Sequence, residues 1–258
     1  MNILVIDIGG TNVKMLASGH EAPRKFPSGR ELTPEKMVAE VLSGTTDWNY
    51  EVVSIGFPGP VLCGQPMTEP VNLGHGWMGF DFTAAFGRPV KVINDAAMQA
   101  LGSYQGGKML FLGFGTGLGA AVVMNGDLEP LEIGRFHYKK HTLEHYVGDG
   151  GRKRQGRKKW QGQVEEIVAR LVQALKPDDV VLGGGNSKKL KPLPPRTRLG
   201  DNSFAFLGGF RLWEPEAGAL PSPAPTEDNN PEERASEPFP KHRLPRRVPT
   251  APEQEAQQ

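Results

Sequence analysis

Two glycine-rich turns, each directly after a short apolar run, constrain this chain more than any other feature. The first is DIGGTN at Asp7–Asn12, and the second is GFGTGLG at Gly113–Gly119. Glycine has no Cβ to block an approaching group and tolerates positive φ, so such turns can point consecutive backbone N–H groups into one concavity. That geometry suits a phosphate. Between the turns lies the pair Asn94-Asp95, which adds a carboxylate able to activate an attacking group.

Composition narrows the class of protein. The chain has 258 residues, 38% of them hydrophobic, which is enough for two lobes with a real core. The net charge of +1 gives no general argument for nucleic-acid or membrane partners. The single cysteine, Cys63, excludes an intrachain disulfide and a Cys-rich zinc site and fits a reducing compartment. The opening run NILVID is too short for a membrane span and lacks the flanks of a signal peptide. We expect a soluble cytoplasmic protein.

Strand and helix patterns alternate along the chain, which indicates an α/β fold. A strand, a glycine hairpin and an α/β unit follow Met1 and recur from Lys108. This echo predicts an N-terminal lobe at 1–107 and a C-terminal lobe at 108–213 with a cleft between them. Predicted strands cover 2–7, 13–19, 51–61, 90–94, 108–115, 119–126 and 178–186, and predicted helices cover 33–44, 96–104, 160–177 and 201–213.

The composition changes after Trp213. Residues 214–258 carry 10 of the 23 prolines and almost no aromatic residues. Such a segment cannot bury enough apolar surface to offset its ordering entropy, so we predict a disordered tail.

The first glycine turn has two interpretations. In one, its backbone and polar side chains hold phosphate, and the Asp7 carboxylate holds Mg²⁺ directly or through water. In the other, it is only a tight hairpin whose aspartate accepts hydrogen bonds within the turn. The predicted phosphate ligands are Asp7, Gly9, Gly10, Thr11, Asn12 and Lys14.

The second turn also has two interpretations. Gly115, Gly117 and Ala120 satisfy the G-x-G-x-x-A fingerprint of dinucleotide-binding oxidoreductases. That fingerprint must lead into a helix, whereas the residues that follow here read as a strand and a hairpin turn. We therefore favour a hairpin that cradles phosphate through Gly115, Thr116 and Gly117.

Asp95 lies where a predicted strand meets a predicted helix. An aspartate there could serve only as a helix N-cap. Alternatively it is a general base on a hydroxyl group, a role worth roughly 10²–10⁴-fold in rate. The two flanking phosphate loops favour the general base.

Six segments in this order, DIGGTNVK, GFPGPV, NLGHGW, VINDAAMQALGSY, GFGTGLGAAVV and VLGGGN, resemble the ROK sugar kinases of the actin-like ATPase superfamily. The resemblance covers about residues 1–213. It implies two ribonuclease-H-like α/β lobes, with sugar and phosphoryl donor meeting in the central cleft. It also implies that Asp95 is the catalytic base. The implied sugar-binding residues are Gly59, Asn72, Asn94, Glu132 and Glu144, and the implied nucleotide-binding residues are Gly183, Gly184, Gly185 and Asn186.

The chain departs from the family pattern around Glu132. LEIGR keeps this glutamate but places Arg135 where most members have histidine, and the zinc-binding cysteines are missing. We therefore expect no zinc, as in the polyphosphate-type glucokinases that this part of the chain resembles. His137, His141 and His145 are spaced four apart and could suggest a metal, but without a cysteine partner we interpret them as loop or helix-face residues.

A basic run, Arg152–Lys159, holds six cations in eight residues without an acid. Such a run is either a solvated face or a track for a long polyanion beside the cleft. The candidate polyphosphate track consists of Arg152, Lys153, Arg154, Arg157, Lys158 and Lys159.

The leading hypothesis is an enzyme of carbohydrate metabolism and glycolysis that phosphorylates the 6-hydroxyl of glucose or a close hexose. The donor would be ATP, polyphosphate or both, with Mg²⁺. The alternative is a non-catalytic ROK-type sugar-binding regulator, which would need a DNA-binding segment ahead of a fold that we expect to begin at Met1. We expect no nucleic-acid or membrane partner. A homodimer is a candidate assembly, and the sequence leaves donor preference, hexose and oligomeric state open.

Overall fold

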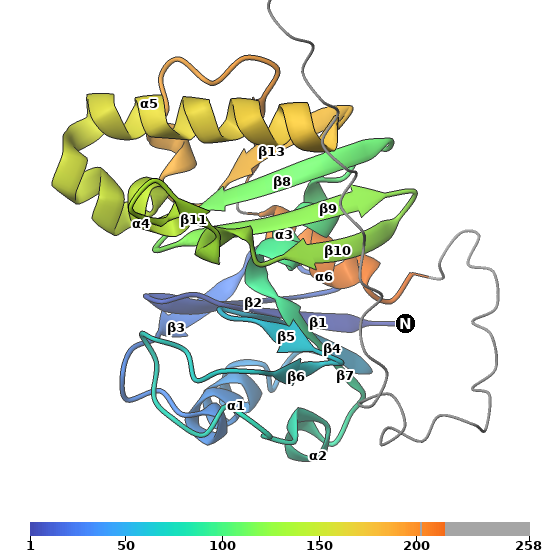
Figure 1. The fold of residues 1–258 in the computed structure, drawn as a ribbon. Helices are drawn as coiled ribbons and strands as arrows, with labels where there is room; N and C mark the ends of the chain where they lie inside the picture. Colours follow the sequence, from blue (N-terminus) through green and yellow to red (C-terminus); the bar gives the residue numbers. More distant parts are fainter. Residues whose placement is uncertain (202, 215–258) are drawn as a thin grey trace, which may run out of the picture. The chain divides into compact units, whose positions relative to one another are not determined.

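Two five-stranded sheets organise the described residues, 1–201 and 203–214, in the computed structural model (Figure 1). The described residues form one compact unit. The predicted disordered tail lies outside the described residues, apart from Glu214. The α/β class with two related sheets confirms the predicted fold.

The first sheet has the order β3-β2-β1-β4-β7. Its central strand β1 (Ile3–Ile8) pairs antiparallel with β2 (Asn12–Ala17) and parallel with β4 (Val52–Phe57). The edges are β3 (Arg24–Pro27) and β7 (Val90–Asn94). The glycine turn at residues 9–11 joins β1 to β2, as the sequence predicts.

The second sheet repeats this pattern with the order β10-β9-β8-β13-β14. Its strand β8 (Lys108–Phe114) pairs antiparallel with β9 (Leu118–Met124) and parallel with β13 (Asp179–Gly183). The edge strands are β10 (Asp127–Leu131) and β14 (Arg198–Leu199). The second sheet begins where the sequence places the second lobe, but the described residues form one unit, so the division into lobes at residue 107 stays a prediction.

Helices cover both faces of each sheet, which is why β1 and β4 are buried along their whole length. On the first sheet, alternate residues of β1 face opposite layers. Leu4 and Ile6 pack toward α1 (Pro34–Gly44), whereas Val5 packs toward α6 (Phe204–Arg211).

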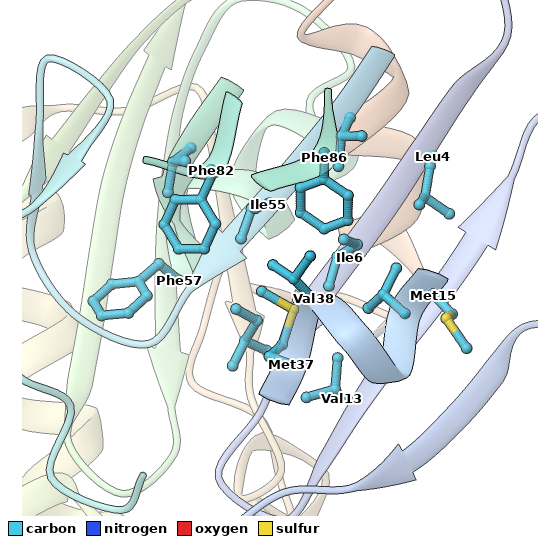
Figure 2. Close-up of a cluster of buried hydrophobic side chains, with 14 of the residues drawn as sticks. Leu4, Ile6, Val13, Met15, Met37, Val38, Ile55, Phe57, Phe82 and Phe86 are labelled. Carbon is cyan, nitrogen blue, oxygen red and sulfur yellow. The ribbon is translucent and has the colours of Figure 1, made fainter. Parts of the chain in front are cut away.

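The α1 layer forms the larger core of the first sheet (Figure 2). Thr33 caps α1 by accepting from the Lys36 N–H at 3.4 Å, and Met37 and Val38 then point at the sheet. Phe82 from the short helix α2 (Phe82–Phe86) fills the same cluster. Each such side chain stabilises the fold by about 1.5–3 kcal/mol when fully buried.

Two helices, α3 (Asp95–Ser103) and α6, lie between the sheets (Figure 1). They cross so closely that glycine is required at the contact. A Cβ on Gly102 would lie 1.8 Å from the Phe204 carbonyl oxygen, and a Cβ on Gly208 would lie 1.8 Å from the Met98 carbonyl oxygen. The glycines inside the predicted final helix therefore serve close packing.

The helix α5 (Asp149–Leu175) covers the other face of the second sheet (Figure 1). It begins at Asp149 rather than at Trp160, so the predicted helix 160–177 is too short. The first half is cationic and has no apolar period, and Gly156 interrupts the helical geometry with φ 73°. Trp160 is buried and anchors the helix by donating to the Val147 carbonyl at 2.7 Å.

Short elements complete the described part of the chain. They are β5 (Val61–Leu62), β6 (Gln65–Pro66), η1 (Ile133–Arg135), β11 (His137–Tyr138), β12 (His141–Thr142), α4 (Leu143–Val147) and η2 (Ser187–Lys189). None of the described helices has the length and apolar character needed to cross a bilayer.

Candidate active site

One cavity of about 660 Å³ is lined by elements from both sheets. Gly10 lines it from the first glycine turn, Asp95 from the start of α3, and Gly115, Thr116 and Gly117 from the second turn. The volume lies in the range of small-molecule sites, about 300–1,000 Å³. The structure thus brings the three main features of the sequence together.

The helix α3 is capped by Asn94, and the alternative in which Asp95 serves only as that cap is wrong. The Asn94 Oδ1 accepts from the Ala97 N–H at 3.1 Å, and its Nδ2 donates to the Gly59 carbonyl at 3.0 Å. Asp95 is the first residue of the helix and accepts from the Ala96 N–H at 2.7 Å. Asn94 therefore both caps α3 and fixes the loop at Gly59.

The electrostatic surroundings of Asp95 bring its pKa close to neutral pH. Burial is the main cause that raises its pKa to about 7, and the negative charges of Asp7 and then Glu132 raise it further. Its exposed area is intermediate because it lines the cavity, yet the protein packed around it leaves the carboxylate poorly solvated. A base with a pKa near the working pH suits proton transfer.

The first glycine turn contributes less to the cavity than the sequence predicts. Only Gly10 lines the cavity; Asp7, Gly9, Thr11, Asn12 and Lys14 do not. The turn is closed internally, because the Gly9 N–H donates to the Asn12 carbonyl at 3.0 Å and the Gly9 carbonyl accepts from the Ser28 hydroxyl at 2.6 Å.

Asp7 is nearly fully buried beneath this turn and pairs across the hairpin with Lys14. The Lys14 Nζ lies 3.6 Å from the Asp7 Oδ2. Burial raises the pKa of Asp7, and the Lys14 charge partly offsets that rise. Asp7 does not line the cavity, but its negative charge helps to raise the pKa of Asp95.

The five residues predicted to bind sugar all line the cavity: Gly59, Asn72, Asn94, Glu132 and Glu144. Glu132 directly precedes η1, and Glu144 lies in the first turn of α4. The Glu144 carboxylate passes close to the second glycine turn, because a Cβ on Gly117 would lie 2.8 Å from the Glu144 Oε2. A side chain at Gly117 would displace this carboxylate.

The GGGN turn after β13 mostly supports the second glycine turn. Gly184 lines the cavity, whereas Gly183, Gly185 and Asn186 do not. The buried Asn186 donates from its Nδ2 to the Gly115 carbonyl at 3.1 Å. Its direct role is to fix the loop that faces the cavity.

The residues of the basic run lie on more than one surface. Arg154 lines the cavity, and Arg152 and Lys153 each pair with Asp149 at 2.7 Å. Lys158 and Lys159 are exposed and do not line the cavity.

Several cavity residues carried no role in the sequence prediction, among them Gln99, Arg135, Thr142, His145, Gly150 and Gly151. A signal existed for Thr142, which caps α4 one turn before His145. The rings of His141 and His145 stack at 4.0 Å. Over residues 1–201 and 203–214, no group of three His, Cys, Asp or Glu side chains has the arrangement of a metal site.

Two related α/β sheets, each with a glycine hairpin at one common cavity, define the actin-like ATPase fold in its ROK sugar-kinase form. The chain belongs to the ROK family, whose model matches residues 3–134.

Proteins of similar sequence agree with this assignment. A polyphosphate glucokinase of Mycobacterium tuberculosis (strain CDC 1551 / Oshkosh) is 28% identical over 211 residues, which are 71% of this chain and 77% of that protein. The polyphosphate glucokinase of Mycobacterium leprae is 29% identical over 205 residues, 72% of this chain and 60% of that protein.

Solved structures share the fold. An inorganic polyphosphate/ATP-glucomannokinase from Arthrobacter sp. strain KM has a TM-score of 0.69 at 25% identity, covering 81% of this chain and 96% of that one. A ROK family glucokinase from Streptomyces griseus, in complex with glucose and AMPPNP, has a TM-score of 0.64 at 17% identity, covering 82% and 99%.

Proposed function

We propose that this protein is a hexose kinase that transfers a phosphoryl group from polyphosphate or ATP to the 6-hydroxyl of glucose or a close hexose. The observation that carries the proposal is Asp95, which has a raised pKa and shares one cavity with both glycine turns and two further carboxylates. The names of the mycobacterial and Arthrobacter proteins support the substrate and donor classes.

Glu132 and Glu144 are the proposed anchors of the sugar. Each carboxylate can accept from two hydroxyls, Asn72 offers an amide group beside them, and Asn94 keeps one amide hydrogen beyond those it uses in the α3 cap and the Gly59 contact. Binding several hydroxyls would direct the remaining one toward Asp95. The reacting groups would then be held in the geometry that the reaction needs.

Asp95 is the proposed base. Its carboxylate would take the proton of the attacking hydroxyl while that oxygen forms a bond to the terminal phosphorus of the donor. The bond from that phosphorus to the bridging oxygen breaks, and the shortened donor leaves with the bonding electrons. General-base catalysis of this kind contributes roughly 10²–10⁴-fold.

The second glycine turn is the proposed seat of the transferring phosphate. Thr116 and Gly117 line the cavity, and their N–H groups have no protein acceptor in the described part of the chain. Such groups stabilise charge on phosphate oxygens without reorganising.

Asp7 and Asp95 are the candidate carboxylates for Mg²⁺. This ion binds through one or two carboxylates together with substrate phosphates, and Asp7 and Asp95 are close enough that the charge of Asp7 raises the pKa of Asp95. Because Asp7 does not line the cavity and pairs with Lys14, it would hold the ion through water. When bound, Mg²⁺ would neutralise charge on the phosphoryl group. We expect no tightly held zinc, because the cysteine thiolates that would bind it are missing from the sequence.

A coupled assay of the full chain tests the proposal. Glucose and Mg²⁺ are supplied with ATP or with polyphosphate, and glucose 6-phosphate is followed through a dehydrogenase. We expect turnover with at least one donor, with ³¹P NMR placing the phosphate on the 6-position. Glucose binding without transfer from either donor would instead support a sugar-binding regulator.

A further inference from the structure

A second hollow, of about 270 Å³, is lined only by cationic side chains. Two come from the first half of α5 and three from the segment around and after η2. We name it the basic groove, and its residues are Arg152, Arg157, Lys188, Lys189 and Lys191. The three lysines lie outside the run that the sequence singles out.

Each wall of the basic groove continues, along the chain, a segment that lines the active-site cavity. On α5, Gly151 lines the cavity, and the next residue, Arg152, lines the groove. On the other wall, Gly184 lines the cavity, and Lys188 lines the groove one short turn later. The groove is therefore linked to the cavity through both of its walls.

Neutral hydrogen bonds hold the walls together at both ends. Near the cavity, the Gly115 carbonyl accepts from the Asn186 Nδ2 at 3.1 Å and from the Asp149 N–H at 3.0 Å, so the second glycine turn joins both walls. At the far end, the Gln161 Nε2 donates to the Pro192 carbonyl at 3.3 Å, and the Lys191 N–H donates to the Gln161 Oε1 at 3.4 Å. The walls are thus joined without the charged groups of Arg157, Lys188 and Lys191.

Most of its charge is left unneutralised. Arg152 pairs with Asp149, and the Lys189 Nζ donates to the Asn186 Oδ1 at 2.6 Å. In residues 1–201 and 203–214, no carboxylate lies within ion-pair distance of Arg157, Lys188 or Lys191. Gathered like charges raise the local concentration of an anion, and this gain is largest for a chain with many charges.

We propose that the basic groove binds the inorganic polyphosphate chain behind the phosphoryl group that is being transferred, with Lys188 and Lys191 as donor-binding residues. This inference rests on the proposed kinase function. ATP carries only three phosphates, which the glycine turns would hold, so the groove serves donors long enough to leave the cavity. Donor affinity should therefore rise with polyphosphate length.

The chain offers a matched control. Lys188→Gln/Lys191→Gln removes two charges from the groove and spares Lys189, which contacts Asn186. Lys158→Gln/Lys159→Gln removes two charges from exposed positions on α5 that do not line the groove. Both variants have the same net charge.

Steady-state kinetics with long-chain polyphosphate, triphosphate and ATP test the inference. The groove variant should raise KM for long-chain polyphosphate about tenfold and leave KM for ATP and kcat within about twofold, because two partly screened contacts are lost. The control variant should match the parent for all three donors. Added salt should raise KM for long-chain polyphosphate more steeply in the parent than in the groove variant.

Equal effects of the two double variants, or equal effects on ATP and polyphosphate, would overturn the inference. Binding of labelled polyphosphate to the full chain, measured by fluorescence anisotropy without glucose, gives a readout independent of turnover. Equal competition by single-stranded DNA of the same charge would reduce the groove to a general polyanion patch. Transfer from ATP without groove-dependent polyphosphate binding refutes the groove alone, whereas no transfer from either donor refutes the kinase.

Discussion

At Asp95, burial makes the carboxylate costly to ionise, and this would make it a stronger base. In water an aspartate with its ordinary pKa would hold a proton too weakly to draw one from a hydroxyl near neutral pH. Burial and the neighbouring charge of Asp7 move the pKa of Asp95 to about 7. Asn94 provides the helix cap that Asp95 would otherwise supply.

The pH dependence of catalysis follows from this pKa. Asp95 must be deprotonated to act as base, so kcat/KM should fall about tenfold per pH unit well below 7 and level off above it. Initial rates between pH 5.5 and 8.5, with saturating Mg²⁺ and a pH-independent coupling system, measure the profile. A flat profile across that range would show that Asp95 does not take the proton.

The two glutamates should act on the sugar rather than on the donor. In Glu144→Gln, the loss of the carboxylate should raise KM for glucose and lower kcat together. The sugar would lose a hydrogen-bond acceptor, and its reacting hydroxyl would no longer be oriented. Calorimetric titration with glucose checks the affinity directly. Unchanged glucose affinity in both Glu144→Gln and Glu132→Gln would remove these residues from the sugar site.

At the scale of elements, the crossing of α3 and α6 shows how packing determines sequence. The two helices approach backbone to backbone at Gly102 and Gly208, and the end of α6 is fastened by Arg211, which donates to the Leu101 carbonyl at 2.7 Å. Since α3 begins with Asp95, this crossing also holds the proposed base in place.

Alanine substitution in two helices should have opposite effects on stability. Gly208→Ala would press a methyl group into the Met98 carbonyl and should destabilise the fold by about 1–3 kcal/mol. Gly162→Ala in α5 meets open space, so its better helix propensity should stabilise by about 0.5–1 kcal/mol. Urea unfolding measures both. A neutral Gly208→Ala would mean that the helices can separate at little cost.

Elements with a clear apolar period could be predicted from the sequence, and those without one could not. The continuous run of β1 and the buried residues Met37, Val38 and Val41 of α1 lie where the sequence predicts a strand at 2–7 and a helix at 33–44. The first half of α5 could not be found in this way, because its cations carry no period and its stability comes from packing around Trp160.

The candidate site, too, could be predicted only where the local sequence carries a signal. Asp95 and the second glycine turn could be identified locally, since the residue types and their position after a strand carry the signal. Whether Thr11 and Lys14 reach the cavity depends on how the first turn closes, and they do not line it. The meeting of Lys188 with Arg157 depends on tertiary contacts, so no local pattern predicts it.

At the scale of the described molecule, two copies of one α/β pattern share a single cavity. One glycine turn from each sheet reaches this cavity, and α3 carries Asp95 between the sheets. Within the ROK family, this arrangement supports phosphoryl transfer to a sugar hydroxyl as the central activity. The assignment depends on Asp95 acting in the chemical step rather than in sugar binding alone.

Asp95→Asn separates those roles most directly. Turnover should fall by at least about 10²-fold, because the amide cannot take a proton, while glucose affinity by calorimetry should stay within about threefold of the parent. Thermal unfolding confirms that the variant is folded. Near-normal phosphorylation of glucose by the folded Asp95→Asn protein would contradict the account.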